Sequence, residues 1–182
     1  RVETRWVEWL DRFPSVFALA EAGTAEVLAA WQGMGYNRRA LALKAAAEQI
    51  AFDCDGVFPT EVKELVALPG IGPATAQGIR AFAFNLPGVY LETNVRTVVL
   101  HPLFPDVPSV PDRELVPIVE ATCPAGLESL ETSSDIDGGP LGDYAVPQDE
   151  DDTPRSWYYA MLDYGAYLKK TVPNPSRRAK AY

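Results

Sequence analysis

The chain has 182 residues, of which 47% are apolar, 10% aromatic and 23% charged, and its formal net charge is −9. This composition is typical of a globular protein with a packed core and excludes a wholly disordered or fibrous chain. The sequence has no apolar run of membrane-spanning length, and its two cysteines, Cys54 and Cys123, are too few for a disulfide framework or a multi-cysteine metal site.

The negative charge is concentrated in one segment. Nine of the 25 acidic residues, and no Lys or Arg, lie between Leu127 and Thr153. The remaining 16 acidic residues balance the 16 basic ones, so the total charge does not exclude a nucleic-acid partner. Residues 124–152 also combine Gly, Pro, Ser and acidic residues with little periodicity, which predicts a surface insertion.

Apolar residues at helical spacing predict an all-α protein, and strand signals are nearly absent. In chain order, helices are expected over residues 1–13, 16–22, 25–31, 36–52, 61–68, 73–84, 93–101, 112–122 and 155–170. Ser15, Thr24 and Thr60 are the expected N-caps of three of these helices, and Pro73 and Pro154 are expected at helix starts. By their spacing, Trp6, Trp9, Trp31 and Trp157 are expected in the core.

The segment from residue 61 to residue 84 combines two expected helices with the turn Leu68-Pro69-Gly70-Ile71-Gly72. Its two glycines permit a tight turn and keep side chains away from backbone N–H groups that point outward at a helix N-terminus. Such a site binds an anion such as a DNA phosphate through backbone dipoles and needs little net positive charge. The alternative is a helical hairpin with a plain glycine turn. The residues expected to contact DNA here are Pro69, Gly70, Ile71, Gly72 and Thr75.

A second segment, Glu92-Thr93-Asn94-Val95-Arg96, follows this hairpin after one short loop. Glu92 and Asn94 stand at the start of an expected helix. If the hairpin binds a DNA phosphate, they lie next to that phosphate. Read alone, the segment favours a plain capping role for Glu92 or Thr93.

Together with three further segments, these motifs resemble the helix–hairpin–helix (HhH-GPD) DNA glycosylase superfamily, most closely its branch of adenine glycosylases and endonuclease III. The five segments stand in the order found in the adenine glycosylases: residues 13–16, 31–36, 68–72, 92–96 and 161–166. The resemblance implies two helical subdomains that flank a DNA-binding cleft. One is a six-helix barrel over residues 14–92 that contains the hairpin (61–84). The other is formed by residues 1–13 and 93–182, and both chain ends are expected to be truncated.

The resemblance makes Glu92 the catalytic carboxylate, at a position where the family has Asp. Its role is to hold negative charge near the sugar while the C1′–N bond breaks and an oxocarbenium-like cation develops. Glu is longer by one methylene and moves the carboxylate by roughly 1 Å unless the backbone compensates, a misplacement that costs about a hundredfold in rate. Asn94 and Tyr36 are expected to line the substrate pocket, with helix capping as the alternative role of Asn94. Arg38 and Arg39 are expected to contact the DNA backbone, with a solvated helix start as the alternative.

Three departures from the family pattern carry further expectations. Where bifunctional members have a lysine that attacks C1′, this chain has Ala74, which implies a monofunctional glycosylase without Schiff-base lyase activity. The glutamate with which the adenine glycosylases protonate the base falls before Arg1. The four cysteines that hold an iron–sulfur cluster in many relatives have no counterpart after residue 170, so we expect no cofactor and no metal. The basic tail there, residues 169–180, could contact phosphates instead.

The sequence thus favours a DNA-repair N-glycosylase that removes adenine opposite 8-oxoguanine. We expect a monomer that binds double-stranded DNA in the cytoplasm, associated with the nucleoid and without membrane contact, and an acidic insertion that faces away from the cleft or is autoinhibitory. Two alternatives stay open. One is a glycosylase for another base, such as uracil or thymine from mismatches or an oxidised pyrimidine. The other is a catalytically silent DNA-binding relative, which the change from Asp to Glu at position 92 favours and the retained Asn94 opposes.

Overall fold

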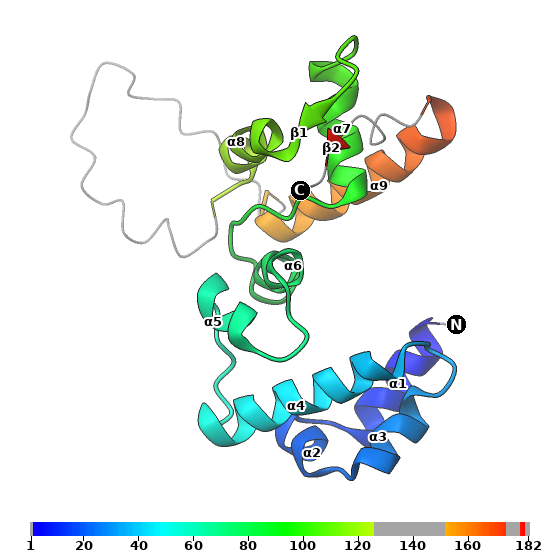
Figure 1. Ribbon diagram of the computed structural model, residues 1–182, viewed down its shortest axis with the longest axis vertical. Coiled ribbons are helices and arrows are strands. Elements are labelled where there is room, and N and C mark those ends of the chain that lie inside the picture. Colours follow the sequence, from blue (N-terminus) through cyan, green and yellow to red (C-terminus); the bar gives the residue numbers. More distant parts are fainter. Residues whose placement is uncertain (1, 126–151, 174–178, 181–182) are drawn as a thin grey trace, which may run out of the picture. The chain divides into compact units, whose positions relative to one another are not determined.

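A computed structural model describes residues 2–125, 152–173 and 179–180 of the chain (Figure 1). The acidic insertion and the arginines of the basic tail lie largely outside these residues. The elements, in chain order, are α1 (Val2–Arg12), α2 (Val16–Glu21), α3 (Thr24–Trp31), α4 (Asn37–Asp53), α5 (Val62–Ala67), α6 (Pro73–Phe84), α7 (Thr93–Leu103), β1 (Val110–Pro111), α8 (Asp112–Thr122), α9 (Pro154–Thr171) and β2 (Ala179–Lys180). The all-α class is confirmed, because the described strands are only a two-residue parallel pair, Val110 with Ala179 and Pro111 with Lys180.

The helix starts test the expected caps. Ser15 has extended backbone angles, and its side chain accepts a hydrogen bond from the N–H of Ala18, as expected of an N-cap. The expected caps Thr24 and Thr60 are wrong. Helix α3 begins with Thr24 itself after Gly23, and the N-cap of α5 is Glu61, neither with a side-chain cap. At the start of α9, Thr153 and Ser156 form a capping box ahead of Pro154.

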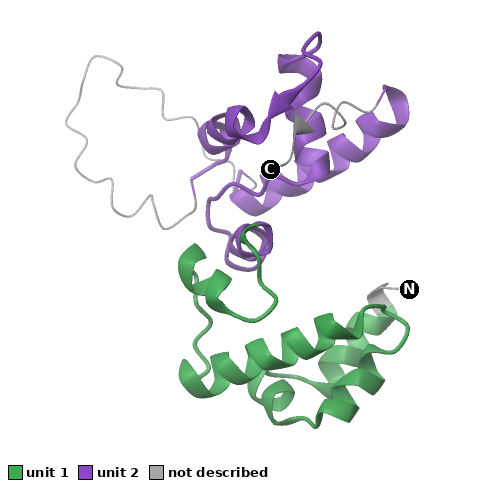
Figure 2. Cartoon of the chain, viewed as in Figure 1, with its two compact units in different colours: residues 1–73 green, residues 74–182 purple. Residues whose placement is uncertain are grey.

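Packing divides the chain into two compact units, residues 1–73 and 74–182 (Figure 2). Their boundary falls inside the hairpin sequence, after Pro73, whereas the expected domains meet at residue 92. The expected division into a barrel over residues 14–92 and a second helical domain stays a prediction. Each unit is described by itself below.

In the first unit, α4 packs against α2 and α3. The contact face of α4 is made of small residues, which let the neighbouring helices approach closely: Ala40, Ala47 and Ala51 are buried in one cluster with Leu19, Ala20 and Val27. Lys44 is also buried there. Its ammonium group donates to the carbonyl oxygen of Ala20 at 2.8 Å and pairs with Glu48 at 2.7 Å, so its charge is compensated.

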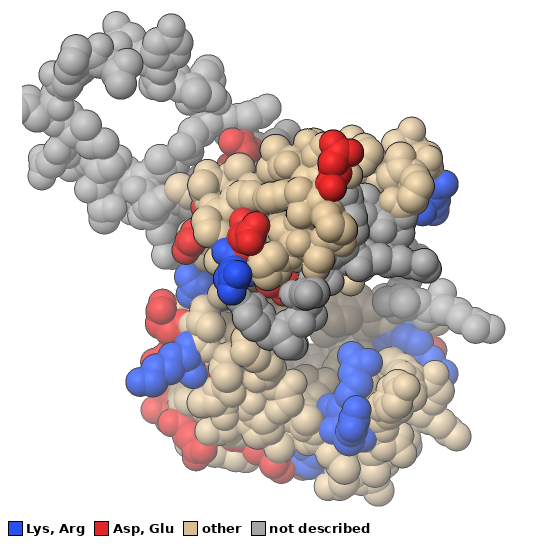
Figure 3. All heavy atoms as spheres, turned by 45° about the horizontal axis from the view of Figure 1, so that its top comes forward, with Lys and Arg blue, Asp and Glu red and all other residues tan. Residues whose placement is uncertain are grey.

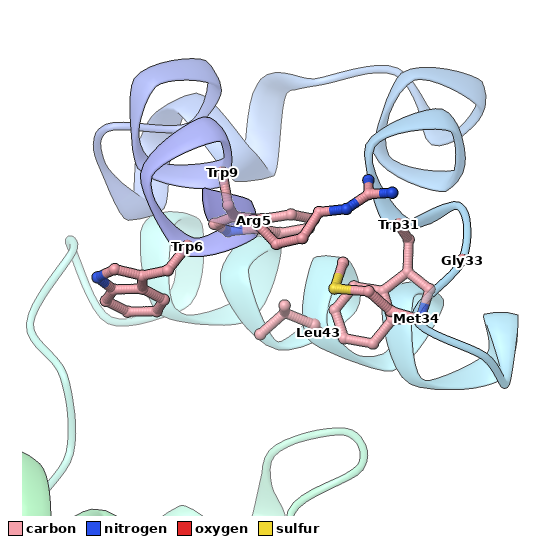
Figure 4. A pocket seen from close by; sticks show the side chains of 7 residues that line it. All are labelled: Arg5, Trp6, Trp9, Trp31, Gly33, Met34 and Leu43. Atoms are coloured by element: carbon pink, nitrogen blue, oxygen red, sulfur yellow. The ribbon is translucent and has the colours of Figure 1, made fainter. Parts of the chain in front are cut away.

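The first unit corrects one core expectation. Trp9 packs edge-on against Trp31, with ring centroids 5.6 Å apart, but Trp6 is 61% exposed. Trp6 lines a hollow of about 710 Å³ together with Trp9, Trp31, Met34 and Leu43, and Figure 4 shows Trp6 on the side of this group away from Trp31 and Met34. Helical spacing places a residue on a face of its helix, but it does not show that a partner covers that face.

In the second unit, α7 is the central helix and packs most extensively against α9. The core contains side chains from α6, α7, β1, α8 and α9: Ala81, Val95, Val99, Leu100, Val110, Leu115, Val119 and Tyr158. Because Glu92 directly precedes α7, this core fixes the position at which the predicted catalytic segment begins.

Candidate active site

The turn of the hairpin belongs to the first unit, and its shape follows from two residues. Pro69 and Gly70 are the central residues of a turn closed by a hydrogen bond from the N–H of Ile71 to the carbonyl oxygen of Leu68 at 3.2 Å. Gly70 has φ +77°, in the left-handed region that glycine adopts without cost. A Cβ at Gly70 would also lie 2.6 Å from the Cβ of Ala42 on α4. Glycine at position 70 is therefore required by the fold itself.

Gly72 differs from Gly70. Its φ lies outside the left-handed region, and a Cβ built on it would meet no atom within 4 Å. The fold therefore tolerates a side chain at position 72, and what the glycine provides is a bare backbone surface. Such a surface lets a ligand approach backbone N–H groups closely.

In the second unit, Glu92 lies on a surface hollow of about 620 Å³. The hollow is formed by one side of α6, the loop before α7 and the start of α7. The lining residues are Ala74, Thr75, Gly78, Ile79, Phe82, Ala83, Tyr90, Leu91, Glu92, Thr93 and Arg96. The predicted carboxylate thus shares a hollow with Thr75, a predicted DNA contact, and with Ala74, at which the resemblance predicts the lysine of bifunctional members to fall.

Glu92 is also the N-cap of α7. Its Oε2 atom accepts a hydrogen bond from the N–H of Asn94 at 2.6 Å. The capping role that the sequence suggested for Glu92 is therefore confirmed. One such bond leaves most of the accepting capacity of a carboxylate unused, and a helix N-terminus interacts favourably with its negative charge.

The loop before Glu92 is held by two side chains that sequence reasoning missed. The buried hydroxyl of Tyr158 on α9 donates to the carbonyl oxygen of Gly88 and accepts from the N–H of Tyr90, the latter at 2.8 Å. Gln77 on α6 accepts from the N–H of Val89 at 3.1 Å. No sequence signal points to Tyr158, which is 68 residues beyond Tyr90.

Burial and neighbouring charges shift the pKa values of three side chains in and near the hollow. Burial raises the pKa of the Tyr158 phenol far above its ordinary value, which keeps the hydroxyl protonated as a donor. Burial also raises the pKa of Tyr90, with a smaller contribution from the negative charge of Glu92. The pKa of Arg96 is raised, first by its hydrogen bonds to Asp112 and also by the charges of Asp112 and Glu92, although its partial burial acts to lower it.

Asn94 is not among the described residues that line this hollow. It packs against Gly165 on α9, where a Cβ would lie 2.4 Å from the backbone oxygen of Asn94. The Oδ1 atom of Asn94 is buried and has no hydrogen-bond partner among the described residues. The expected role of Asn94 in the substrate pocket stays a prediction, and Gly165 has a physical reason to be glycine.

The remaining predicted site residues lie in the first unit. Tyr36 is 73% exposed and has φ +51°, a left-handed conformation that is uncommon outside glycine and costs about 1 kcal/mol or more. The guanidinium of Arg38 lies 5.8 Å from the centre of the Tyr36 ring, and that of Arg39 lies 5.8 Å from the Trp31 ring. Tyr36, Arg38 and Arg39 thus form an exposed aromatic and basic group at the start of α4.

On the face that Figure 3 shows, Lys and Arg stand in small groups among acidic and uncharged residues. The part of the chain that the structure describes also contains no cluster of three or more His, Cys, Asp or Glu side chains suited to hold a metal ion. Among its helices, none combines the length and apolarity needed to cross a membrane.

Comparison with known proteins agrees with these features. Residues 1–123 match the model of a family described as "HhH-GPD superfamily base excision DNA repair protein". The adenine DNA glycosylase of Mycolicibacterium smegmatis is 46% identical over 99 residues, which are 54% of this chain and 34% of that protein. The adenine DNA glycosylase of Mycobacterium tuberculosis is 43% identical over 99 residues, or 54% and 33%. This chain therefore spans about a third of the length of these curated relatives.

Two solved structures share the fold. A thermostable thymine-DNA glycosylase superposes with a TM-score of 0.57 and 20% identity, over 69% of this chain and 59% of that one. Endonuclease III in a trapped covalent intermediate with DNA superposes with a TM-score of 0.50 and 21% identity, over 54% and 46%. At these identities the likeness concerns the fold alone.

Proposed function

This chain belongs to the HhH-GPD superfamily of base excision DNA repair proteins, and from that premise we propose that it is part of a DNA N-glycosylase. The enzyme binds double-stranded DNA, extrudes one base and hydrolyses its bond to the sugar. The observation that carries the proposal is that Glu92 lines the same hollow as Ala74 and Thr75, at the start of the hairpin's second helix.

In the proposed reaction, the C1′–N bond breaks and its electron pair leaves with the base, which takes up a proton. The sugar becomes oxocarbenium-like, and the carboxylate of Glu92 stabilises its positive charge. A water molecule then adds to C1′ and loses a proton. The bare backbone of Gly70 and Gly72 binds a DNA phosphate, and the exposed ring of Tyr36 stacks on a base near the extruded nucleotide.

We further propose that the reaction is monofunctional and that the substrate is adenine opposite 8-oxoguanine. Ala74 offers no amine at the hollow, so no Schiff base can form there. The substrate assignment is supported by the two mycobacterial relatives, both named adenine DNA glycosylase. Borohydride treatment during turnover should trap no enzyme–DNA adduct, while endonuclease III is trapped in parallel. An adduct that maps to the start of α6 would contradict the monofunctional assignment.

The decisive variant is Glu92→Gln, because glutamine can still accept the hydrogen bond that caps α7 but carries no charge. In single-turnover assays of the full-length protein on duplexes with different lesions, we expect adenine release to slow by about a hundredfold or more. Glu120→Gln removes the same charge from an exposed position on α8 and should leave the rate unchanged.

A second candidate is a catalytically silent DNA-binding relative. The observation that favours it is the engagement of the Glu92 carboxylate as the N-cap of α7. In that case the wild type and Glu92→Gln release base equally slowly from every duplex, while both still bind DNA.

A further inference from the structure

Glu92 and Arg96 stand one helical turn apart at the start of α7, and both line the hollow. A glutamate four residues before an arginine is a favourable arrangement for an ion pair on a helix. Such a pair would neutralise the carboxylate that, in the proposed function, must meet a developing positive charge. The proposed role of Glu92 therefore requires that Arg96 does not pair with it.

Arg96 is bound elsewhere. Its Nε donates to Oδ1 of Asp112 at 2.9 Å and its Nη2 donates to Oδ2 at 2.6 Å, a two-pronged pair between α7 and the first residue of α8. The side chains of Arg96 and Asp112 are only 20% and 12% exposed. Among the described residues, the ion pair of Arg96 is with Asp112, and Glu92 is in none.

We propose that Asp112 is a positioning residue for the active site: it engages the guanidinium of Arg96 in a two-pronged pair, so that Arg96 does not form an ion pair with Glu92 and the Glu92 carboxylate stays available to the hollow. This inference rests on the proposed function of Glu92. The two-pronged geometry suits the task, because a planar guanidinium bound by two of its nitrogens cannot rotate toward a second carboxylate without losing both bonds.

A purely structural role is the competing explanation, since Asp112 also joins α8 to α7. Buried ion pairs contribute little net stability compared with apolar residues of the same volume. A contribution to stability is therefore a weak explanation for the presence of Arg96 near Glu92 and for its ion pair with Asp112. The two explanations differ in what happens when Arg96 is removed as well.

Asp112→Asn keeps the shape and one acceptor but loses the charge that holds Arg96. We expect single-turnover base release to slow by about tenfold to a hundredfold, with the Kd for duplex DNA within about twofold of wild type. In the Arg96→Gln background there is no guanidinium that could pair with Glu92, so Asp112→Asn should change the rate of base release by less than about threefold. A double variant slowed as strongly as Asp112→Asn alone would overturn the proposal in favour of the structural role.

A crystal structure of Asp112→Asn separates this inference from the proposed function. We expect a guanidinium nitrogen of Arg96 within about 4 Å of a carboxylate oxygen of Glu92. If Arg96 turns to Glu92 while the wild-type protein releases no base, the restraining role of Asp112 holds and the glycosylase proposal fails. If Arg96 stays away from Glu92, the restraining role is refuted whatever the activity. Should Asp112→Asn not fold, Asp112→Glu, which retains the charge, is expected to keep the wild-type rate to within about threefold, and a larger loss would count against the proposal.

Discussion

The loops on either side of α6 are both glycine-containing and both lead into a helix, but they are fixed in different ways. The loop of residues 68–72 is shaped locally, by Pro69, by the left-handed Gly70 and by a hydrogen bond that spans three residues. The loop of residues 85–92 is shaped from a distance, by Gln77 on α6 and by Tyr158 on α9. The shape of the first loop is therefore set mainly by its own residues, although Gly70 packs against Ala42 on α4, whereas the shape of the second depends on α9.

This difference matches what each loop has to do. Binding a phosphate through backbone N–H groups needs only a correct local backbone, which two or three residues can specify. Placing a carboxylate against one atom of an extruded sugar needs accuracy relative to other helices, which only tertiary contacts supply. Substitutions at the contacts of α7 and α9 around the loop of residues 85–92 should therefore have larger effects on stability than substitutions in the loop of residues 68–72.

The largest effect is expected from Gly165→Ala. The added Cβ would lie 2.4 Å from the backbone oxygen of Asn94, and neither helix backbone can move aside cheaply. We expect a loss of about 3 kcal/mol in the free energy of unfolding, measured in urea. Ala166→Gly, at the exposed neighbouring position, should cost only the helix propensity of about 1 kcal/mol. Equal stability of Gly165→Ala and wild type would show that α7 does not depend on this contact.

Tyr158→Phe tests the second loop directly. Loss of the hydroxyl leaves the carbonyl oxygen of Gly88 and the N–H of Tyr90 without their partner, which should cost about 2 kcal/mol. Base release should slow as well, because the loop that precedes Glu92 loses its anchor. Tyr159→Phe removes the same atom from an exposed neighbour and should change neither stability nor rate. If the two variants behave alike, the loop is held by Gln77 or by its own backbone instead.

The same contrast explains which features the sequence could predict. The helix bounds, the turn at residues 68–72 and the cap at Ser15 rest on local preferences and were predicted from local patterns, although the same preferences misplaced the caps of α3 and α5 by one residue, at Thr24 and Thr60. Glu92 was found through its motif, and its capping role through its position. Other features depend on tertiary contacts between residues far apart in the sequence, and a single sequence contains no signal for such contacts. These features are the anchoring by Tyr158, the Arg96–Asp112 pair and the exposure of Trp6. The absence of Asn94 from the lining of the hollow has the same origin, because Asn94 packs against Gly165 on α9.

In the local loop, Gly70→Ala should lower the free energy of unfolding by about 1.5 kcal/mol. One part of this cost is the left-handed backbone, and the other is the contact with Ala42. A double-mutant cycle with Ala42→Gly separates the two parts, because it relieves the contact and leaves the backbone cost in place. If the cycle shows no coupling, the strain at Gly70 is entirely conformational.

Gly72→Ala should have the smallest effect on stability, within about 0.5 kcal/mol of wild type, because the new methyl group meets only open space. Its effect should appear in binding: a methyl group on a bare backbone surface blocks close approach of a phosphate, and we expect affinity for duplex DNA to fall by about tenfold. Gly23→Ala is the matched control, since a Cβ at Gly23 also meets nothing within 4 Å. Anisotropy titrations at fixed salt measure both affinities. Equal affinities in the two variants would contradict phosphate binding at the loop of residues 68–72, because Gly72 is the glycine of this loop that the fold itself does not require.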